Sequence, residues 1–153
     1  MTEVVDGKGP DATASEVLRR LRKFLLALAV LLFVGSLVEL WLVGHTEDWI
    51  QLIPFVLAVV AIVVSLLVWF SASAGTIQVL RAWMALVVLG TLFGVYQHIA
   101  GNVAFELEVD PKATTSDLVW QGIGGGNPLL APGILAIAAL IAVAATYRCQ
   151  QPD

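Results

Sequence analysis

The chain has 153 residues, of which 59% are hydrophobic and only 13% are charged, and its formal net charge is −4. With a mean hydropathy of +0.89, this composition excludes an ordinary soluble domain and indicates an integral membrane protein. The acidic balance and the lack of a basic, aromatic-lined face exclude nucleic acid as a partner.

The N-terminal segment predicts a polar tail followed by a basic membrane anchor. Residues 1–14 are expected to form a disordered cytoplasmic tail, and from Ser15 a short amphipathic helix is expected to lead into the membrane. The basic residues of this segment are Arg19, Arg20, Arg22 and Lys23. Cations here can contact anionic headgroups, so membrane lipids are expected partners. The acidic start and the missing small-residue cleavage pattern argue against a signal peptide.

Four apolar runs are long enough to cross a bilayer. A hydrocarbon core of about 30 Å requires about 20 mostly apolar residues in a helix. The runs cover approximately residues 24–44, 50–70, 77–98 and 128–147. They predict an all-α membrane protein, a four-helix transmembrane bundle that forms one domain over residues 15–149. Residues 150–153 are expected to be a second cytoplasmic tail.

Small residues recur every four positions in the third and fourth runs. Gly90 and Gly94 lie on one face of the third run, and Ala138 and Ala142 on one face of the fourth. Helices in lipid associate best where small residues let their backbones approach closely. Both faces are therefore predicted to be helix contacts, and the Pro132–Gly133 pair predicts a bend near the outer surface.

The connection between the first two runs is short and polar, "HTED". Gly44 is expected to end the first helix, and Asp48 with Gln51 resembles a capping pair for a following turn. Pro54 predicts either a kink in the second helix or a separate turn over residues 49–53.

The connection at residues 99–127 is much longer and carries two predicted elements. Residues 103–109 alternate between an apolar and an acidic face, which is the period of a strand, so a short extended extracytoplasmic segment is predicted to cover the bundle's mouth. The stretch "TTSDLVWQGI" predicts a short capped helix, after which Asn127 is expected to cap the fourth run. A structural cap and a binding lid both fit this connection.

The distribution of cations predicts the orientation. All but one of the eight Lys and Arg residues belong to the tails or to one end of the runs, and only Lys112 lies on the other side. By the positive-inside rule both termini are expected in the cytoplasm, with residues 99–127 outside. The single cysteine, Cys149, is expected to remain reduced on the cytoplasmic side.

Both histidines and most of the acidic residues are predicted to gather at the extracytoplasmic end. Glu39 is the only acid inside an apolar run, and such a carboxylate marks a functional-site hypothesis because its burial is costly. We expect it to face the bundle interior and to contact His98 or Gln97, directly or through water. The candidate polar binding site comprises Glu39, His45, Glu47, Gln97, His98, Asn102 and Glu106. Asp48 is interpreted as a cap rather than a ligand.

Three interpretations of this site stay open: a hydrogen-bonded structural cluster, a divalent metal site, and a path for protons or a substrate. No HxxxH, HExxH or CxxC spacing occurs in the chain. The residue pattern therefore identifies neither a metal nor another cofactor.

The leading function is that of a binding, transport-associated or accessory membrane protein, working as a homo-oligomer or within a larger membrane complex. Four short helices can hardly enclose a wide aqueous path alone. The alternative is a membrane-embedded enzyme that uses Glu39 and His98 as acid and base groups on a lipid-like substrate. Nucleophilic catalysis has little support, because the chain lacks a GxSxG elbow and Cys149 is expected at the end away from the histidines.

Two strings, "HTEDWIQLIPFVL" and "YQHIAGNVAFELEVDP", resemble segments of uncharacterised bacterial four-span integral membrane proteins. The resemblance covers approximately the second and third runs and the outer connection. It implies the bacterial inner membrane as the location and implies no activity.

Overall fold

The computed structural model describes residues 10–147, and all regular secondary structure in that range is helical. The predicted all-α class is thus confirmed. The helices are α1 (Pro10–Leu42), the 3-10 helix η1 (Trp49–Leu52), α2 (Ile53–Phe70), α3 (Ala74–Val109), α4 (Thr115–Gly124) and α5 (Leu130–Ala145). Residues 10–14, expected in a disordered tail, belong to α1. The remainder of that tail, Cys149 and the tail at 150–153 lie outside the described residues.

Three of the helices are long and apolar enough to cross a membrane: Ala14–Leu42 of α1, Trp49–Phe70 and Ala74–Val109. These three helices support the prediction that the chain is a membrane protein. The fourth predicted run contains a shorter apolar helix, since α5 has 16 residues and is about 24 Å long at the usual rise of an α-helix.

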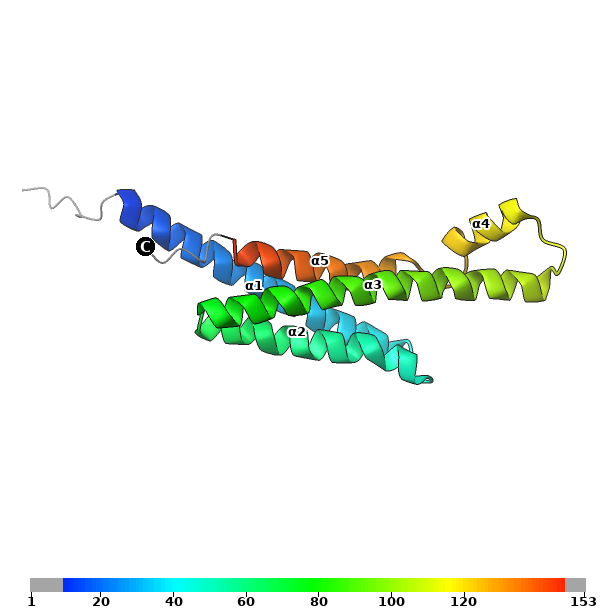
Figure 1. Ribbon diagram of the computed structural model, residues 1–153, viewed down its shortest axis with the longest axis horizontal. Helices are drawn as coiled ribbons and strands as arrows, with labels where there is room; N and C mark the ends of the chain where they lie inside the picture. The colour runs from blue at the N-terminus through cyan, green and yellow to red at the C-terminus, as the bar shows by residue number, and fades with distance from the viewer. Residues whose placement is uncertain (1–9, 148–153) are drawn as a thin grey trace, which may run out of the picture.

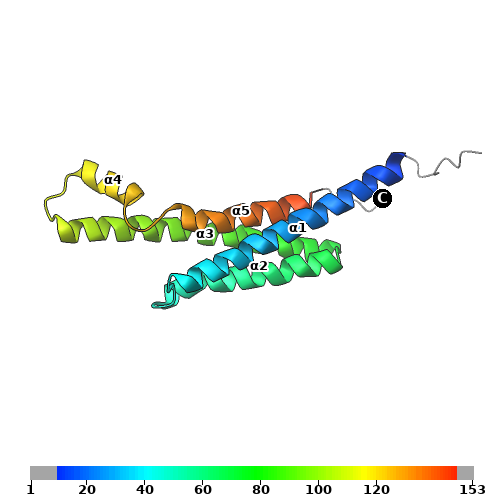
Figure 2. The same cartoon turned by 180° about the vertical axis from the view of Figure 1, so that it is seen from behind.

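Four helices pack side by side in the cyclic order α1, α2, α3, α5 (Figures 1 and 2). Each contacts its two neighbours, whereas α1 and α3 lie diagonally opposite and their backbones do not approach closely within the described residues. The fully buried large side chains include Phe33 of α1 and Ile77, Leu80, Met84 and Val87 of α3. The core therefore lies along the first half of α3.

The predicted small-residue contacts are present. A Cβ atom on Gly94 would lie 3.3 Å from the Cβ atom of Pro132, and one on Gly90 would collide with the end of the Leu57 side chain. On α5, Ala138 and Ala142 are fully buried. Glycine and alanine thus set the spacing between α3 and its two neighbours.

The predicted extended segment at residues 103–109 is wrong, because α3 continues as one helix to Val109. A single strand would leave its backbone groups unpaired, whereas each residue added to an existing helix gains a hydrogen bond without a new nucleation step. The helix ends before Pro111, since the residue preceding a proline disfavours the helical conformation; Asp110 is extended.

The predicted short helix after this point is confirmed as α4. Its N-cap is Thr114, whose hydroxyl accepts a hydrogen bond from the Asp117 amide at 3.3 Å, while the Asp117 carboxylate accepts from the Thr114 amide at 2.9 Å. This reciprocal pair is a capping box. In Figure 1, α4 folds back along the part of α3 that projects beyond the other helices.

One end of the bundle is closed by basic side chains. Arg81 at the start of α3 donates hydrogen bonds to the hydroxyl and carbonyl oxygens of Thr146, at 3.0 and 2.7 Å. Arg22 donates to the carbonyl of Tyr147 at 3.2 Å, and the Lys23 ammonium lies 5.4 Å from the ring centroid of Trp69. The hydrogen bonds join the carboxyl end of α5 to α1 and α3, and the contact of Lys23 with Trp69 joins α1 to α2. We call this region the closed end.

Candidate functional site

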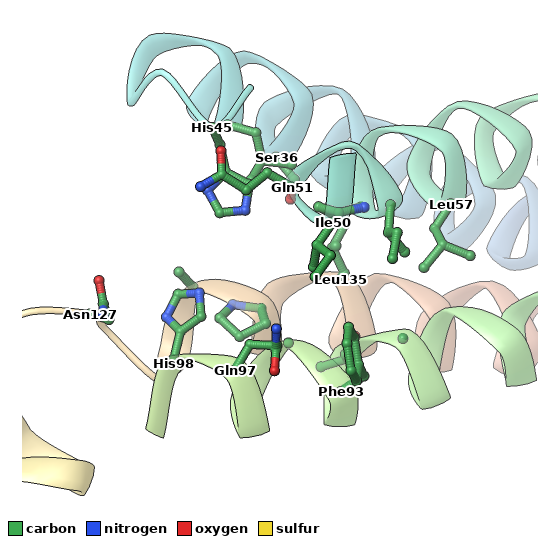
Figure 3. A pocket seen from close by; sticks show the side chains of 18 of the residues that line it. Ser36, His45, Ile50, Gln51, Leu57, Phe93, Gln97, His98, Asn127 and Leu135 are labelled. Carbon is green, nitrogen blue, oxygen red and sulfur yellow. The ribbon is translucent and has the colours of Figure 1, made fainter. Parts of the chain in front are cut away.

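A pocket of about 510 Å³ lies between the helices at the opposite end. There the α1–α2 pair diverges from the α3–α5 pair (Figures 1 and 2), and side chains from both pairs line the space between them (Figure 3). Because α1 and α3 are diagonal members of the bundle, their facing sides do not close on each other. We call this region the open end.

The end of α1 brings His45 to the mouth of the pocket. Gly44 adopts a left-handed conformation with φ of 69°, as expected for the residue that stops this helix. The His45 amide then donates to the Leu40 carbonyl at 2.9 Å and the Gly44 amide to the Trp41 carbonyl at 3.2 Å. These two bonds form a Schellman motif, which fixes the direction of the chain after the helix.

The second wall begins with η1. The Gln51 side chain accepts hydrogen bonds from the amides of Glu47 at 2.8 Å and Asp48 at 3.4 Å, so the predicted pairing of Asp48 with Gln51 is present. Pro54 lies in the first turn of α2, where it interrupts no helical hydrogen bond, and the separate turn before it is confirmed. Both Asp48 and Gln51 line the pocket, whereas Glu47 is exposed beside it.

The facing wall consists of α3 and the start of α5. Gln97 and His98 extend from α3 toward the side that carries His45 and Gln51 (Figure 3). The Nδ1 atom of His98 is buried without a hydrogen-bond partner, and so is the hydroxyl of Ser36 on α1. Buried polar atoms are nearly always paired in proteins. Two others in the described residues also lack a partner, the Nε atom of Arg22 and the hydroxyl of Ser65, but neither lines the pocket.

His98 affects the protonation of His45 across the mouth of the pocket. Burial lowers the pKa of His45 below its ordinary value, and the proximity of His98 lowers it further. Protonation of His45 would place a cation in a partly enclosed space beside a second titrating ring. The neutral form is therefore favoured at neutral pH.

Glu39 lines the pocket together with His98 and Gln97, but its side chain is exposed. Within residues 10–147 no hydrogen bond or ion pair engages its carboxylate, so the direct contact predicted with His98 or Gln97 is absent. The physical reason is the diagonal placement of α1 and α3. A water-bridged contact stays a prediction.

Asn102 has a structural place outside the pocket. Its side chain is buried, donates to the carbonyls of Gly122 at 3.2 Å and Asn127 at 3.1 Å, and accepts from the Asn127 amide at 2.8 Å. Asn127 thus does not cap α5, which begins at Leu130, and instead lines the pocket mouth. A Cβ atom on Gly125 would collide with Asn102, so this tight connection requires glycine. Glu106 lies one turn farther along α3, away from the pocket.

The structure therefore joins four of the predicted site residues and separates three. Glu39, His45, Gln97 and His98 line one pocket, while Glu47, Asn102 and Glu106 do not. Sequence reasoning missed the pocket roles of Ser36, Gln51 and Asn127. The spacing of Ser36 and Glu39, three residues apart on one helix face, was the signal available for the first of them.

Within the described residues, no three His, Cys, Asp or Glu side chains are grouped closely enough to hold a metal ion. Acid–base catalysis is also poorly prepared, because a general base is usually oriented by a hydrogen bond from a third group and the buried His98 Nδ1 has none. Ligand binding does not depend on a group that orients His98 beforehand. The arrangement thus suits binding better than chemistry.

The chain matches no protein-family model, and neither the curated proteins nor the solved structures contain a significant match to it.

Proposed function

We propose that this chain is a multi-pass bacterial inner-membrane protein that binds a small molecule in the pocket at its open end. In this proposal α1, α2, α3 and α5 all cross the bilayer and both termini are cytoplasmic. The pocket and the projecting α3–α4 hairpin then face the extracytoplasmic side. The positive-inside rule supports this orientation, since Arg22, Lys23 and Arg81 lie at the closed end.

The observation that carries the binding proposal is the pair of unpartnered polar atoms in a pocket of ligand size. Small-molecule sites occupy about 300–1,000 Å³ and combine apolar walls with a few converging polar groups. The pocket has that size, and the Ser36 hydroxyl in its wall is buried with no partner in the protein. A buried hydroxyl without a partner costs free energy, and a turn of the Ser36 side chain into the pocket that it lines would let a ligand or water supply the missing hydrogen bond.

The orientation is tested with introduced cysteines in a Cys149→Ser background. Thr115→Cys, at the start of α4, should react in intact cells with a membrane-impermeant methanethiosulfonate. In the unsubstituted protein, Cys149 should react only after the cells are opened. The reverse pattern would overturn the orientation.

The pocket is tested by comparing two positions on α1 with the same reagent. Ser36→Cys lies deeper in the bilayer than Val38→Cys, but Ser36 lines the pocket whereas Val38 is 51% exposed on the outer surface of the bundle. We expect the deeper cysteine to react and the shallower, lipid-facing cysteine to be protected. Reaction at Val38→Cys alone, or at neither position, would contradict a water-accessible pocket.

A further inference from the structure

The charges around the pocket are all of one sign. Its titratable side chains are Glu39, His45, Asp48 and His98, and no Lys or Arg lines it. Because burial and His98 favour the neutral form of His45, the two carboxylates are not balanced by a fixed cation. An anionic ligand would be repelled by both carboxylates, whereas a cation would be attracted by them.

The rest of the lining is apolar. Away from the mouth the walls carry the side chains of Pro54, Leu57, Phe93, Pro132 and Leu135. A small inorganic cation would leave this surface in contact with water. A ligand with an apolar body would cover it and gain about 25 cal/mol for each Å² of apolar surface removed from water.

The available acceptors favour a cation that can donate hydrogen bonds. The Ser36 hydroxyl lies in the wall about one helical turn below Glu39 and has no partner, and the Nδ1 atom of His98 is likewise free. A protonated amine carries N–H donors that either atom can accept when His98 is neutral. A quaternary ammonium group has no such donors.

We propose that the pocket binds an amphipathic organic amine, whose protonated nitrogen lies among Glu39, Asp48 and the unpartnered Ser36 hydroxyl and whose apolar body rests on Leu57, Phe93 and Leu135. This inference rests on the proposed binding function and adds the chemical class of its ligand. Gln51, Gln97 and Asn127 supply further polar contacts at the mouth, where the amine enters.

Three probes of similar size and different charge test the proposal: 4-phenylbutylamine, 4-phenylbutan-1-ol and 4-phenylbutanoate. Each is titrated by calorimetry into the full chain in phosphatidylcholine nanodiscs at pH 7.5, with empty nanodiscs as the reference for partition into lipid. The amine is protonated at this pH, because an alkylamine titrates near pH 10. We expect the amine to bind at least tenfold more tightly than the alcohol and the carboxylate not to bind measurably.

The matched variants are Glu39→Gln and Glu108→Gln. Glu39 lines the pocket, whereas Glu108 is an exposed carboxylate on the projecting part of α3. Glu39→Gln should weaken amine binding at least tenfold and leave alcohol binding unchanged, while Glu108→Gln should change neither. Asp48→Asn provides a second pocket variant should Glu39→Gln fail to fold, and it should weaken amine binding in the same direction.

Equal affinity for the amine and the alcohol, or no effect of the pocket variants, would overturn the amine class. If Ser36→Cys still reacts in that case, only the ligand class is rejected and the proposed binding pocket is retained. No binding of any probe would also overturn the amine class, and an unreactive Ser36→Cys would overturn the proposed function itself.

Discussion

The two ends of the helix bundle differ in what lies between the helices. At the closed end, Arg81 and Arg22 donate hydrogen bonds to the last carbonyls of α5, so cations join the helix terminus to its neighbours, although the Nε atom of Arg22 is buried without a partner. At the open end, Ser36 and His98 retain buried polar atoms without partners. The same four helices are thus joined by hydrogen bonds from cations at the closed end and lie apart where the pocket opens.

The difference between the two ends indicates which end stabilises the fold and which end can bind a ligand. Helices in lipid gain little from hydrophobic association, so close packing and hydrogen bonds decide which contacts hold. Close packing runs from Ile77 near the closed end through Met84 to Phe33 just below the pocket, and all three side chains are fully buried. The open end can therefore lose or gain contacts with a ligand without loss of the fold.

The largest expected effect is loss of core packing beneath the pocket. Phe33→Ala should destabilise the protein by about 3 kcal/mol, which is the lower end of the range for such truncations. The cavity left by the phenyl ring has its full cost, but the transfer contribution is small because the ring would be surrounded by lipid when the helices separate. Phe70→Ala, at a site 82% exposed, should have little effect. Unfolding of the purified protein in denaturing detergent measures both. Equal effects would remove the distinction between core and lipid-facing sides.

A smaller effect is expected from opening the closed end. Arg81→Met should lower the free energy of unfolding by about 1–3 kcal/mol. The substitution removes the charged donors that Arg81 directs at the hydroxyl and carbonyl oxygens of Thr146 and leaves these buried acceptors with fewer hydrogen bonds. Arg20→Met removes only a surface pair with Glu16 and should cost less than about 0.5 kcal/mol. The same unfolding measurement applies. A closed end that tolerates Arg81→Met as easily as Arg20→Met would contradict its assigned role.

A local effect is expected beyond the pocket. Asn102→Ala removes the hydrogen bonds that join α3 to Gly122 and Asn127, and should destabilise this connection by about 1–2 kcal/mol. Amide exchange should accelerate in α4 and in residues 125–129 but remain unchanged at the closed end. Asn102→Asp keeps the acceptor for the Asn127 amide and should have an intermediate effect. Uniform acceleration along the chain would indicate global rather than local destabilisation.

The smallest effect is a pH response confined to the open end. The pKa of His45 is lowered in the folded state, so the unfolded chain binds more protons between the folded value and the ordinary value of 6.5. Stability is therefore complete above pH 6.5 and falls as the pH decreases below it. His98 strengthens this effect, and the carboxylates Glu39 and Asp48 line the same pocket.

Amide exchange of residues 43–52 between pH 7.5 and 5.5, corrected for intrinsic exchange, measures this response. It should accelerate relative to residues 77–87 of α3 as the pH falls. His45→Gln should remove most of the difference. A response equal at both ends, or unchanged in His45→Gln, would assign the pH dependence to other groups.

Local signals along the chain predicted much of this fold. Gly44 ends α1, Thr114 and Asp117 cap α4, Pro54 begins α2 after a separate turn, and Gly90 and Gly94 mark a close helix contact. Each depends on a few neighbouring residues or on one helical face. Such signals survive tertiary packing because they reflect backbone geometry and side-chain size.

The remaining features depend on relations between helices. Residues 103–109 have a strand-like period, but no second strand lies within the described residues to pair with them, and the helix that precedes them continues instead. Glu39 was expected to touch His98 because both lie near one end of the bundle. The packing of all four helices decides whether two of them are neighbours or diagonal partners. The spacing of residues within one helix gives no information about that packing.

The length of α3 has a mechanical consequence. Its 36 residues make a rod of about 54 Å, considerably longer than the roughly 30 Å of a hydrocarbon core, and the described helix has no break between the wall that carries His98 and its outer tip at Val109. A sideways push on the tip, where α4 is attached, would act as a lever with its pivot in the packed first half of α3. The stretch around Gln97 and His98 would turn with the tip, because it belongs to the same unbroken helix. Movement of the α3–α4 hairpin would therefore change the width of the pocket, although the hairpin lies outside it.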